Sequence, residues 1–360
     1  EVERVVVTGA GGRTGALVME RLLAGGVDAV GLVRSEKKAR KLRRRLARAT
    51  GRGGDELEGA VEAGDVLDVE RLERLLRGAD ALVLCSSATP QIKKRSVAWA
   101  LLNKLVRRSV RPSFRWPKDG EPEKVDWTGA LNQLAVAKAA GVRKVVYVGS
   151  MGGTQPDNFL NTIGEGNILV WKRRAEMSLV LSGLDYTIIH PGGLTNEEGG
   201  QRQLLVGVDD ELLDGPPAAR RIPRADVAAV AVACLSLRSA ANVSFDLAST
   251  DLEEGAEPTD IETLVSSLGG KSCDYTINAP PGSDLEPFLN NQERARDWIQ
   301  QWRDMTSQSM GKLEQSSGVA EPKKQVQRWI QNWKDRTADR AAEAPAASAA
   351  DEAPAVDSEA

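Results

Sequence analysis

Histidine is almost absent from this chain of 360 residues, in which His190 is the single example. A metal site built from several histidines is therefore excluded, and acid–base chemistry falls to carboxylates, lysines, hydroxyls or a cofactor. The three cysteines, Cys85, Cys234 and Cys273, are odd in number and widely spaced. This spacing argues against a disulfide framework or a zinc knuckle and indicates a reducing compartment. We expect no metal site.

Long apolar runs and an excess of one charge are also missing. No run reaches 18 apolar residues, which excludes a membrane-spanning helix. The 48 Lys and Arg nearly balance the 51 Asp and Glu and leave a net charge of −3, so the overall charge does not favour a nucleic-acid partner.

The chain has instead an alternation of short β-branched runs with longer helical patterns. The runs are apolar on both faces, as in a buried parallel sheet, and they cover residues 4–8, 28–33, 81–85, 144–148 and 186–190. Helical patterns between them cover residues 15–23, 69–76, 129–140 and 171–181. The alternation predicts an α/β fold for residues 1–278, a Rossmann-type doubly wound parallel sheet. A less regular stretch at about 87–125 is interpreted as a surface insertion.

Beyond about residue 279 the strand pattern stops. A linker leads to two similar segments, 295–306 and 326–337, which share the form W-I-Q-x-W-[RK]-D-x-T. The last 23 residues, 338–360, hold 11 alanines and six acidic residues, a composition that cannot bury a core and predicts a disordered tail. Residues 279–337 are thus a mostly helical extension with two tryptophan repeats.

A glycine-rich turn follows the first strand and opens the first helix. It reads Thr8-Gly-Ala-Gly-Gly-Arg-Thr-Gly15, with the G-x-x-G-x-x-G glycines at Gly9, Gly12 and Gly15. These would permit the tight turn, the approach of a pyrophosphate and close packing of helix on strand, and the helix N-terminus would attract the phosphates. A turn without a ligand is the alternative, and the context favours nucleotide binding.

The end of the second strand indicates which nucleotide would bind. An acidic residue there would bind the ribose 2′-OH of NAD, but the chain has Arg34, which fits the 2′-phosphate of NADP. The basic helix at 37–48 is interpreted mainly as a solvated face. Asp65, after the third strand, would reach the adenine amino group or cap a helix, and Asp226 is expected to cap a helix that begins at Val227.

Several blocks together resemble the atypical short-chain dehydrogenase/reductase family, in its plant and algal NAD(P)-binding, epimerase/dehydratase-like branch. They are residues 7–15, 31–34, 125–129, 137–142, 148–154, 167–173, 192–194, 204–207 and 224–228. The resemblance implies NADP (NADPH) in the cleft, an unknown small-molecule substrate, and residence in the chloroplast stroma, with the cytoplasm as the alternative. The expected cofactor-binding residues are Thr8, Gly9, Gly11, Gly12, Arg13, Thr14, Gly15, Arg34, Asp65, Ser86, Ser87, Lys172, Pro191, Gly192 and Gly193.

The same resemblance assigns two catalytic candidates. Ser150 and Lys172 stand where the family keeps its Ser and the Lys of Tyr-x-x-x-Lys, but Ile168 occupies the tyrosine position. Without that phenol as proton donor, Ser150 and Lys172 are interpreted first as lining the cofactor pocket. Tyr147 is expected in the core, and His190 is expected to pack or hydrogen-bond at a strand end.

Four tryptophans in the repeats carry the partner prediction. Trp298 and Trp302 share one helical face, as do Trp329 and Trp333. Either the two helices fold back onto the main domain, or they dock a protein partner through aromatic anchors, which the recurrence favours. Two functions follow: an NADP-dependent oxidoreductase, or a non-catalytic NADP-responsive scaffold that docks a plastid partner.

Overall fold

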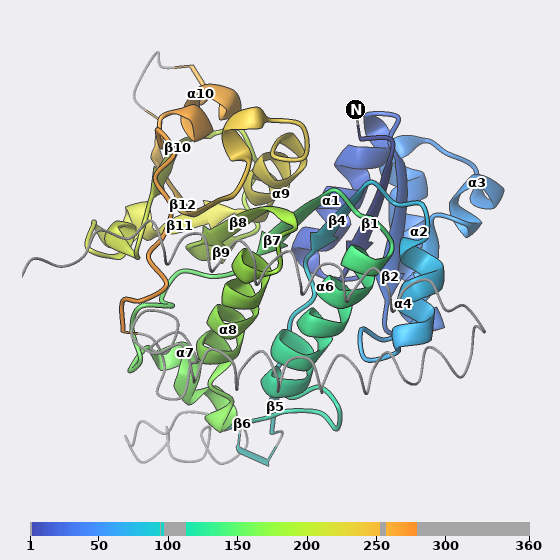
Figure 1. The fold of residues 1–360 in the computed structure, drawn as a ribbon, viewed down its shortest axis with the longest axis horizontal. Coiled ribbons are helices and arrows are strands. Elements are labelled where there is room, and N and C mark those ends of the chain that lie inside the picture. Colours follow the sequence, from blue (N-terminus) through green and yellow to red (C-terminus); the bar gives the residue numbers. More distant parts are fainter. Residues whose placement is uncertain (1, 94, 97–112, 253–256, 279–360) are drawn as a thin grey trace, which may run out of the picture. The chain divides into compact units, whose positions relative to one another are not determined.

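Short buried strands alternate with helices because each strand of a parallel sheet must be covered on both faces. A computed structural model describes residues 2–93, 95–96, 113–252 and 257–278 (Figure 1). Its main sheet has the order β3-β2-β1-β4-β7-β8-β12-β11-β9, and β10 pairs with β12. The strands are β1 (Arg4–Thr8), β2 (Asp28–Val33), β3 (Val61–Ala63), β4 (Ala81–Leu84), β7 (Lys144–Val148), β8 (Asp185–Pro191), β9 (Gly193–Thr195), β10 (Arg202–Gly207), β11 (Arg221–Pro223) and β12 (Val243–Asp251).

Parallel pairing runs without interruption from β3 to β12, and β10 and β11 pair with β12 in the antiparallel sense. The strand order reverses between β1 and β4, so the connections from these two strands leave on opposite sides of the sheet. A crevice opens at such a point beyond the carboxyl ends of the strands. The predicted doubly wound Rossmann-type fold is confirmed.

Helices cover both faces of the sheet (Figure 1). On one face α1 packs against α2 and α9, and on the other α6 packs against α4 and α8. Val5 and Val7 on β1 join the first core, whereas Val6 joins the second. The helices are α1 (Arg13–Ala24), α2 (Glu36–Thr50), α3 (Gly54–Glu58), α4 (Val69–Leu76), α6 (Gly129–Ala139), α7 (Phe159–Thr162), α8 (Ile168–Leu181), α9 (Arg224–Ala233) and α10 (Ile261–Ser266). Within the described ranges no helix has the length and apolarity that crossing a bilayer requires.

The region interpreted as an insertion contains regular structure at both ends. β5 (Gln91–Ile92) pairs with β6 (Phe114–Arg115) in a separate two-stranded sheet. A π-helix, η1 (Glu123–Thr128), leads directly into α6, and π-helical turns often occur at functional sites. The 3-10 turns are η2 (Ile163–Glu165), η3 (Glu211–Leu213), η4 (Pro217–Arg220) and η5 (Arg238–Ala240).

The expected helix cap at Asp226 is wrong. α9 begins at Arg224 with Pro223 at its N-cap position, so Asp226 lies inside the first turn. Its carboxylate accepts a hydrogen bond of 2.7 Å from the backbone N–H of Gly200. The carboxylate therefore fixes a distant loop, a contact that the local pattern cannot show.

Candidate functional site

The glycine-rich turn is shaped by close backbone contacts. Gly9 has a φ of +64°, and a Cβ there would lie 2.4 Å from the carbonyl oxygen of Cys85. A Cβ on Gly15 would lie 2.5 Å from the carbonyl oxygen of Gly9, so neither position accepts a side chain. The Gly12 N–H donates to the Gly9 carbonyl at 2.8 Å and closes the turn.

The first turn of α1 has no side-chain cap. Gly12 is the N-cap residue and has no side chain to accept a hydrogen bond from the N–H groups of the first turn. These groups and the positive end of the helix dipole favour an anion at this point. The local structure therefore fits a phosphate-bearing ligand.

A cleft of about 240 Å³ lies in front of this turn. Nine of the expected cofactor residues line it: Gly9, Gly11, Gly12, Arg13, Thr14, Gly15, Arg34, Ser86 and Ser87. Sequence reasoning did not assign Leu32, Val33, Lys38, Gly64, Val66, Cys85, Thr89, Val125, Leu194 and Arg224, which also line it. Burial raises the pKa of the Cys85 thiol to about 12, so this thiol is neutral and unreactive at pH 7.

The charged side chains that line the cleft, among the described residues, are all cationic. Arg13, Arg34, Lys38 and Arg224 line it, and no acidic side chain does so among the described residues. Burial and the neighbouring charge of Arg13 lower the pKa of Arg224, whose guanidinium is held by the Thr195 carbonyl at 2.9 Å. A cleft of this kind favours a ligand with several negative charges.

Other expected cofactor residues lie away from the cleft lining. Thr8 is fully buried in β1, and Asp65 accepts a hydrogen bond of 3.0 Å from the Leu67 N–H. Asp65 is not the alternative helix cap either, because Asp68 caps α4. A Cβ on Gly192 would lie 2.4 Å from the Arg220 carbonyl oxygen, so close backbone packing accounts for this glycine. Pro191 and Gly193 flank it at the β8–β9 junction.

Lys172 is engaged in a buried ion pair. Its Nζ lies 2.9 Å from Asp126 Oδ1, and the two side chains are 8% and 0% exposed. The other oxygen of Asp126 accepts a hydrogen bond of 2.9 Å from the Ala88 N–H. The pair joins α8 to η1, so the lysine charge is neutralised within the protein.

No tyrosine is among the described residues that line the cleft. Tyr147 is buried in the core as expected, and burial raises the pKa of its hydroxyl well above the ordinary value. Its ring centroid lies 5.8 Å from Lys172 Nζ. A buried phenol with a raised pKa is a poor proton donor to a ligand in the cleft.

Ser150 faces a second and much smaller cavity, of about 10 Å³. Its hydroxyl donates to the Met151 carbonyl at 3.1 Å. The cavity is also lined by Gly153, Thr154, Arg173, Glu176, His190, Asp209, Asp210, Asp246 and Cys273. Lys172 is not among the described residues that line this cavity.

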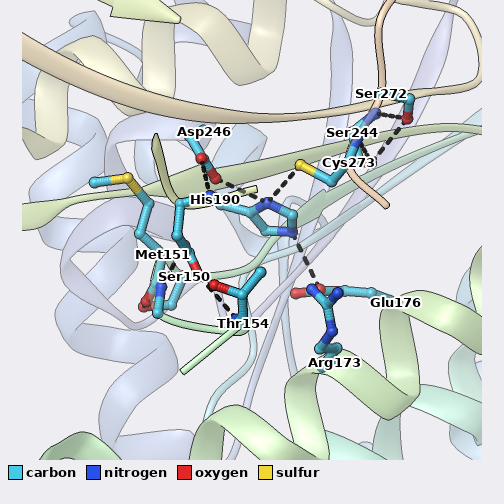
Figure 2. Close-up of polar contacts among 12 residues, drawn as sticks. Ser150, Met151, Thr154, Arg173, Glu176, His190, Ser244, Asp246, Ser272 and Cys273 are labelled. Carbon is cyan, nitrogen blue, oxygen red and sulfur yellow. Dashed lines mark hydrogen bonds and ion pairs between the residues drawn. The ribbon is translucent and has the colours of Figure 1, made fainter. Parts of the chain in front are cut away.

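His190 lies at the end of β8 within this second group (Figure 2). Its Nε2 is 3.1 Å from Glu176 Oε2, and its Nδ1 is 3.3 Å from Asp246 Oδ1 and 3.6 Å from Cys273 Sγ. Burial lowers the pKa of His190, but its neighbours, led by Glu176, raise this pKa well above its ordinary value. The expectation that His190 packs and hydrogen-bonds at a strand end is confirmed.

Sequence reasoning missed Arg224 in the cleft and the residues that contact Lys172 and His190. Asp126 and Arg224 stood within the motif blocks 125–129 and 224–228, which was the available signal. Glu176, Asp246 and Cys273 had no signal, because their partner His190 lies far from them along the chain. The partner-binding candidates Trp298, Trp302, Trp329 and Trp333 lie outside the described residues.

Comparison with known proteins places these features in context. Residues 9–237 match a family described as NAD(P)H-binding. The chain is 43% identical over 269 residues to an uncharacterized chloroplastic protein of Arabidopsis thaliana, a match that covers 74% of this chain and 76% of the relative. It is 40% identical over 275 residues to sanguinarine reductase of Eschscholzia californica, which covers 73% of this chain and 95% of that protein.

Among solved structures, one from Bacillus halodurans, assigned as an NAD-dependent epimerase/dehydratase, has a similar fold. It superposes with a TM-score of 0.54 at 24% identity and covers 74% of this chain and 100% of that one. At 24% identity the match supports a shared fold only.

Proposed function

We propose, since this chain belongs to the NAD(P)H-binding family, that it is an NADPH-dependent oxidoreductase that reduces a small electrophilic molecule. The observation that carries the proposal is the cleft itself, with a glycine turn at its base and four cationic side chains along its walls. The similarity to sanguinarine reductase supports a reductase.

Arg34 and Lys38 support the preference for NADPH over NADH. Arg34 follows β2 and Lys38 lies in the first turn of α2, and both line the cleft. A charge-assisted contact from Arg34 to the 2′-phosphate would contribute on the order of 1.5–3 kcal/mol. This corresponds to a preference of roughly 10- to 150-fold.

The remaining cleft residues would hold the rest of the cofactor. The N-terminus of α1 would bind the pyrophosphate, and Ser86 and Ser87 at the end of β4 would lie beside the diphosphate and ribose. NADPH supplies a hydride from its nicotinamide ring. We propose Ser150 and Pro191-Gly-Gly193 as the residues that lie near the nicotinamide ring. Lys172 would support the site indirectly, through its ion pair with Asp126.

The missing tyrosine restricts the class of substrate. Ile168 replaces the usual proton donor, and the Lys172 charge is matched by Asp126. We therefore infer a conjugated, electron-poor acceptor that takes up hydride without a proton from the protein. In a cationic C=N⁺ group, for example, hydride adds to carbon and the π electrons become the nitrogen lone pair, so the step is balanced without a proton.

The test is NADPH oxidation, followed by absorbance, with iminium, quinone and ketone acceptors. We expect turnover of at least one of the first two classes. We also expect Arg34→Ala to raise the KM for NADPH at least about tenfold while the KM for NADH changes less than about twofold.

Lys37→Ala is the matched control, because Lys37 is an exposed neighbouring cation that does not line the cleft. An equal loss with NADPH and NADH would contradict the 2′-phosphate assignment. Tight NADPH binding without turnover of any acceptor would instead favour the scaffold function.

The scaffold remains the second candidate because of the repeated tryptophan segments. In that function NADPH would be a signal rather than a reductant, and the repeats would dock a protein partner. For either function we propose the chloroplast stroma as the location, which the similarity to a chloroplastic relative supports.

A further inference from the structure

Three side chains that can bind metal converge behind the cofactor cleft. They are His190 on β8, Asp246 on β12 and Cys273 in the segment after α10, and they are 4%, 1% and 8% exposed. One ligand atom from each lies within 4.8 Å of the other two. Figure 2 shows Asp246 and Cys273 directed toward the same edge of the His190 ring.

Two of the three distances between these atoms match tetrahedral zinc, and the third, from Sγ to Oδ1, is at most 4.8 Å. Typical bond lengths are about 2.3 Å for Zn–S, about 2.05 Å for Zn–N and about 2.1 Å for Zn–O. With tetrahedral angles, these lengths require about 3.6 Å between N and S and about 3.4 Å between N and O. The observed distances are 3.6 Å from Nδ1 to Sγ and 3.3 Å from Nδ1 to Oδ1.

The surroundings orient the ligands as in known zinc sites. Glu176 lies 3.1 Å from Nε2 of His190, so with an ion bound this nitrogen would keep its proton and donate it to the carboxylate, while Nδ1 would give up its proton and bind the ion. Asp246 Oδ2 accepts a hydrogen bond of 2.6 Å from the Asp210 N–H. Its Oδ1 is buried and lies 3.3 Å from His190 Nδ1, so an ion between these two atoms would take the place of that contact.

The size of the adjoining cavity excludes the main chemical alternative, which is that Cys273 is a catalytic nucleophile. A thiol beside an imidazole that is oriented by a carboxylate also resembles an activated nucleophile. The adjoining cavity is about 10 Å³, which is the space of one water molecule and not of an acyl substrate. One water is what a three-ligand zinc site needs as its fourth ligand.

We propose that His190 Nδ1, Asp246 Oδ1 and Cys273 Sγ bind a structural Zn²⁺ ion, with one water as the fourth ligand. Sulfur, nitrogen and oxygen donors together suit this borderline-soft ion. The ion would join β8, β12 and the segment after α10, which no disulfide holds because the three cysteines are free. The site departs from the expectation of no metal.

The experiment uses the full, untagged chain purified without chelators. We expect about one zinc per chain by elemental analysis, and a thiolate-to-metal charge-transfer band after replacement by Co²⁺. We expect EDTA to lower the Tm by at least about 5 °C and added Zn²⁺ to restore it. NADPH binding is measured separately, so failure of this proposal is distinguishable from failure of the proposed function.

Two variants identify the ligands. Cys273→Ser should lose the charge-transfer band and bind zinc at least about tenfold more weakly. The double variant Cys85→Ala, Cys234→Ala leaves Cys273 as the single thiol and should keep the band, which serves as the test if Cys273→Ser does not fold. Absence of stoichiometric zinc and of the band in the wild-type protein would overturn the proposal, as would a band that survives in Cys273→Ser.

Discussion

At the scale of one residue, Lys172 shows that burial can change the role that a motif assigns to a side chain. The resemblance assigned this lysine to the cofactor, but its charge is paired with Asp126 at 2.9 Å in a nearly water-free environment. A buried charge that loses its partner is strongly destabilising. Loss of activity in a Lys172 variant would therefore not by itself identify a catalytic role.

We predict that Lys172→Ala lowers the free energy of unfolding by about 3–5 kcal/mol, because Asp126 is left as an uncompensated buried charge. The variant Lys172→Met, Asp126→Asn should recover much of this loss, since the Asn oxygen still accepts from the Ala88 N–H. Urea denaturation of the single and double variants measures both values. If the single and the double variant lose equal free energy of unfolding, the charge pair is not the cause of the loss.

At the scale of elements, one half-buried carboxylate connects the starts of three strands. Asp80, just before β4, accepts hydrogen bonds of 2.9 Å from the Glu3 and Arg4 N–H groups at the start of β1. Its other oxygen accepts from Arg143, just before β7, at 2.6 Å. Hydrogen bonds from Arg4, Arg143 and Glu3 lower the pKa of Asp80 from 3.8 to about 2.

The sign of the pH dependence follows from this lowered pKa. The stabilisation by Asp80 is fully present above the unfolded value of 3.8 and is lost as the pH falls toward about 2. We predict that Asp80→Asn has a lower Tm than the wild type at pH 7 and that the difference shrinks between pH 4 and pH 2. Thermal unfolding over that range measures it. A difference that stays constant with pH would contradict the role of the charge.

At the scale of the whole molecule, the Rossmann domain and the tryptophan repeats are proposed to act separately. The cleft is built from residues of the first 224 positions, whereas the repeats begin at residue 295. The repeats are not among the described residues of the cleft lining, so we expect cofactor binding and docking to respond to different substitutions.

We predict that replacing Trp298, Trp302, Trp329 and Trp333 by Ala in the full chain abolishes capture of a partner from plastid extract. The affinity for NADPH should change less than about twofold, because the described residues that line the cleft all lie within the first 224 positions. Replacing Trp171, which lies in α8, is the control for loss of a tryptophan elsewhere. Equal capture by the wild type and the fourfold variant would refute docking.

Local patterns in the sequence were sufficient to predict β1, β2, β4, β7 and β8, the glycine turn and the cationic position after β2. A buried strand, a turn that accepts no Cβ and the residue that ends a strand are each defined by a few consecutive residues. Helix boundaries were less certain, as the error at Asp226 shows, because a carboxylate near a helix start can bond to a distant loop instead.

Only the tertiary structure decided which distant charges meet. His190 and Cys273 are 83 residues apart along the chain, and Lys172 and Asp126 belong to different helices. Neither pair has a spacing or motif that local reasoning can detect. The sequence alone determined the five predicted strands and the glycine turn because neighbouring residues specify them, whereas contacts between side chains depend on how the sheet brings separate strands together.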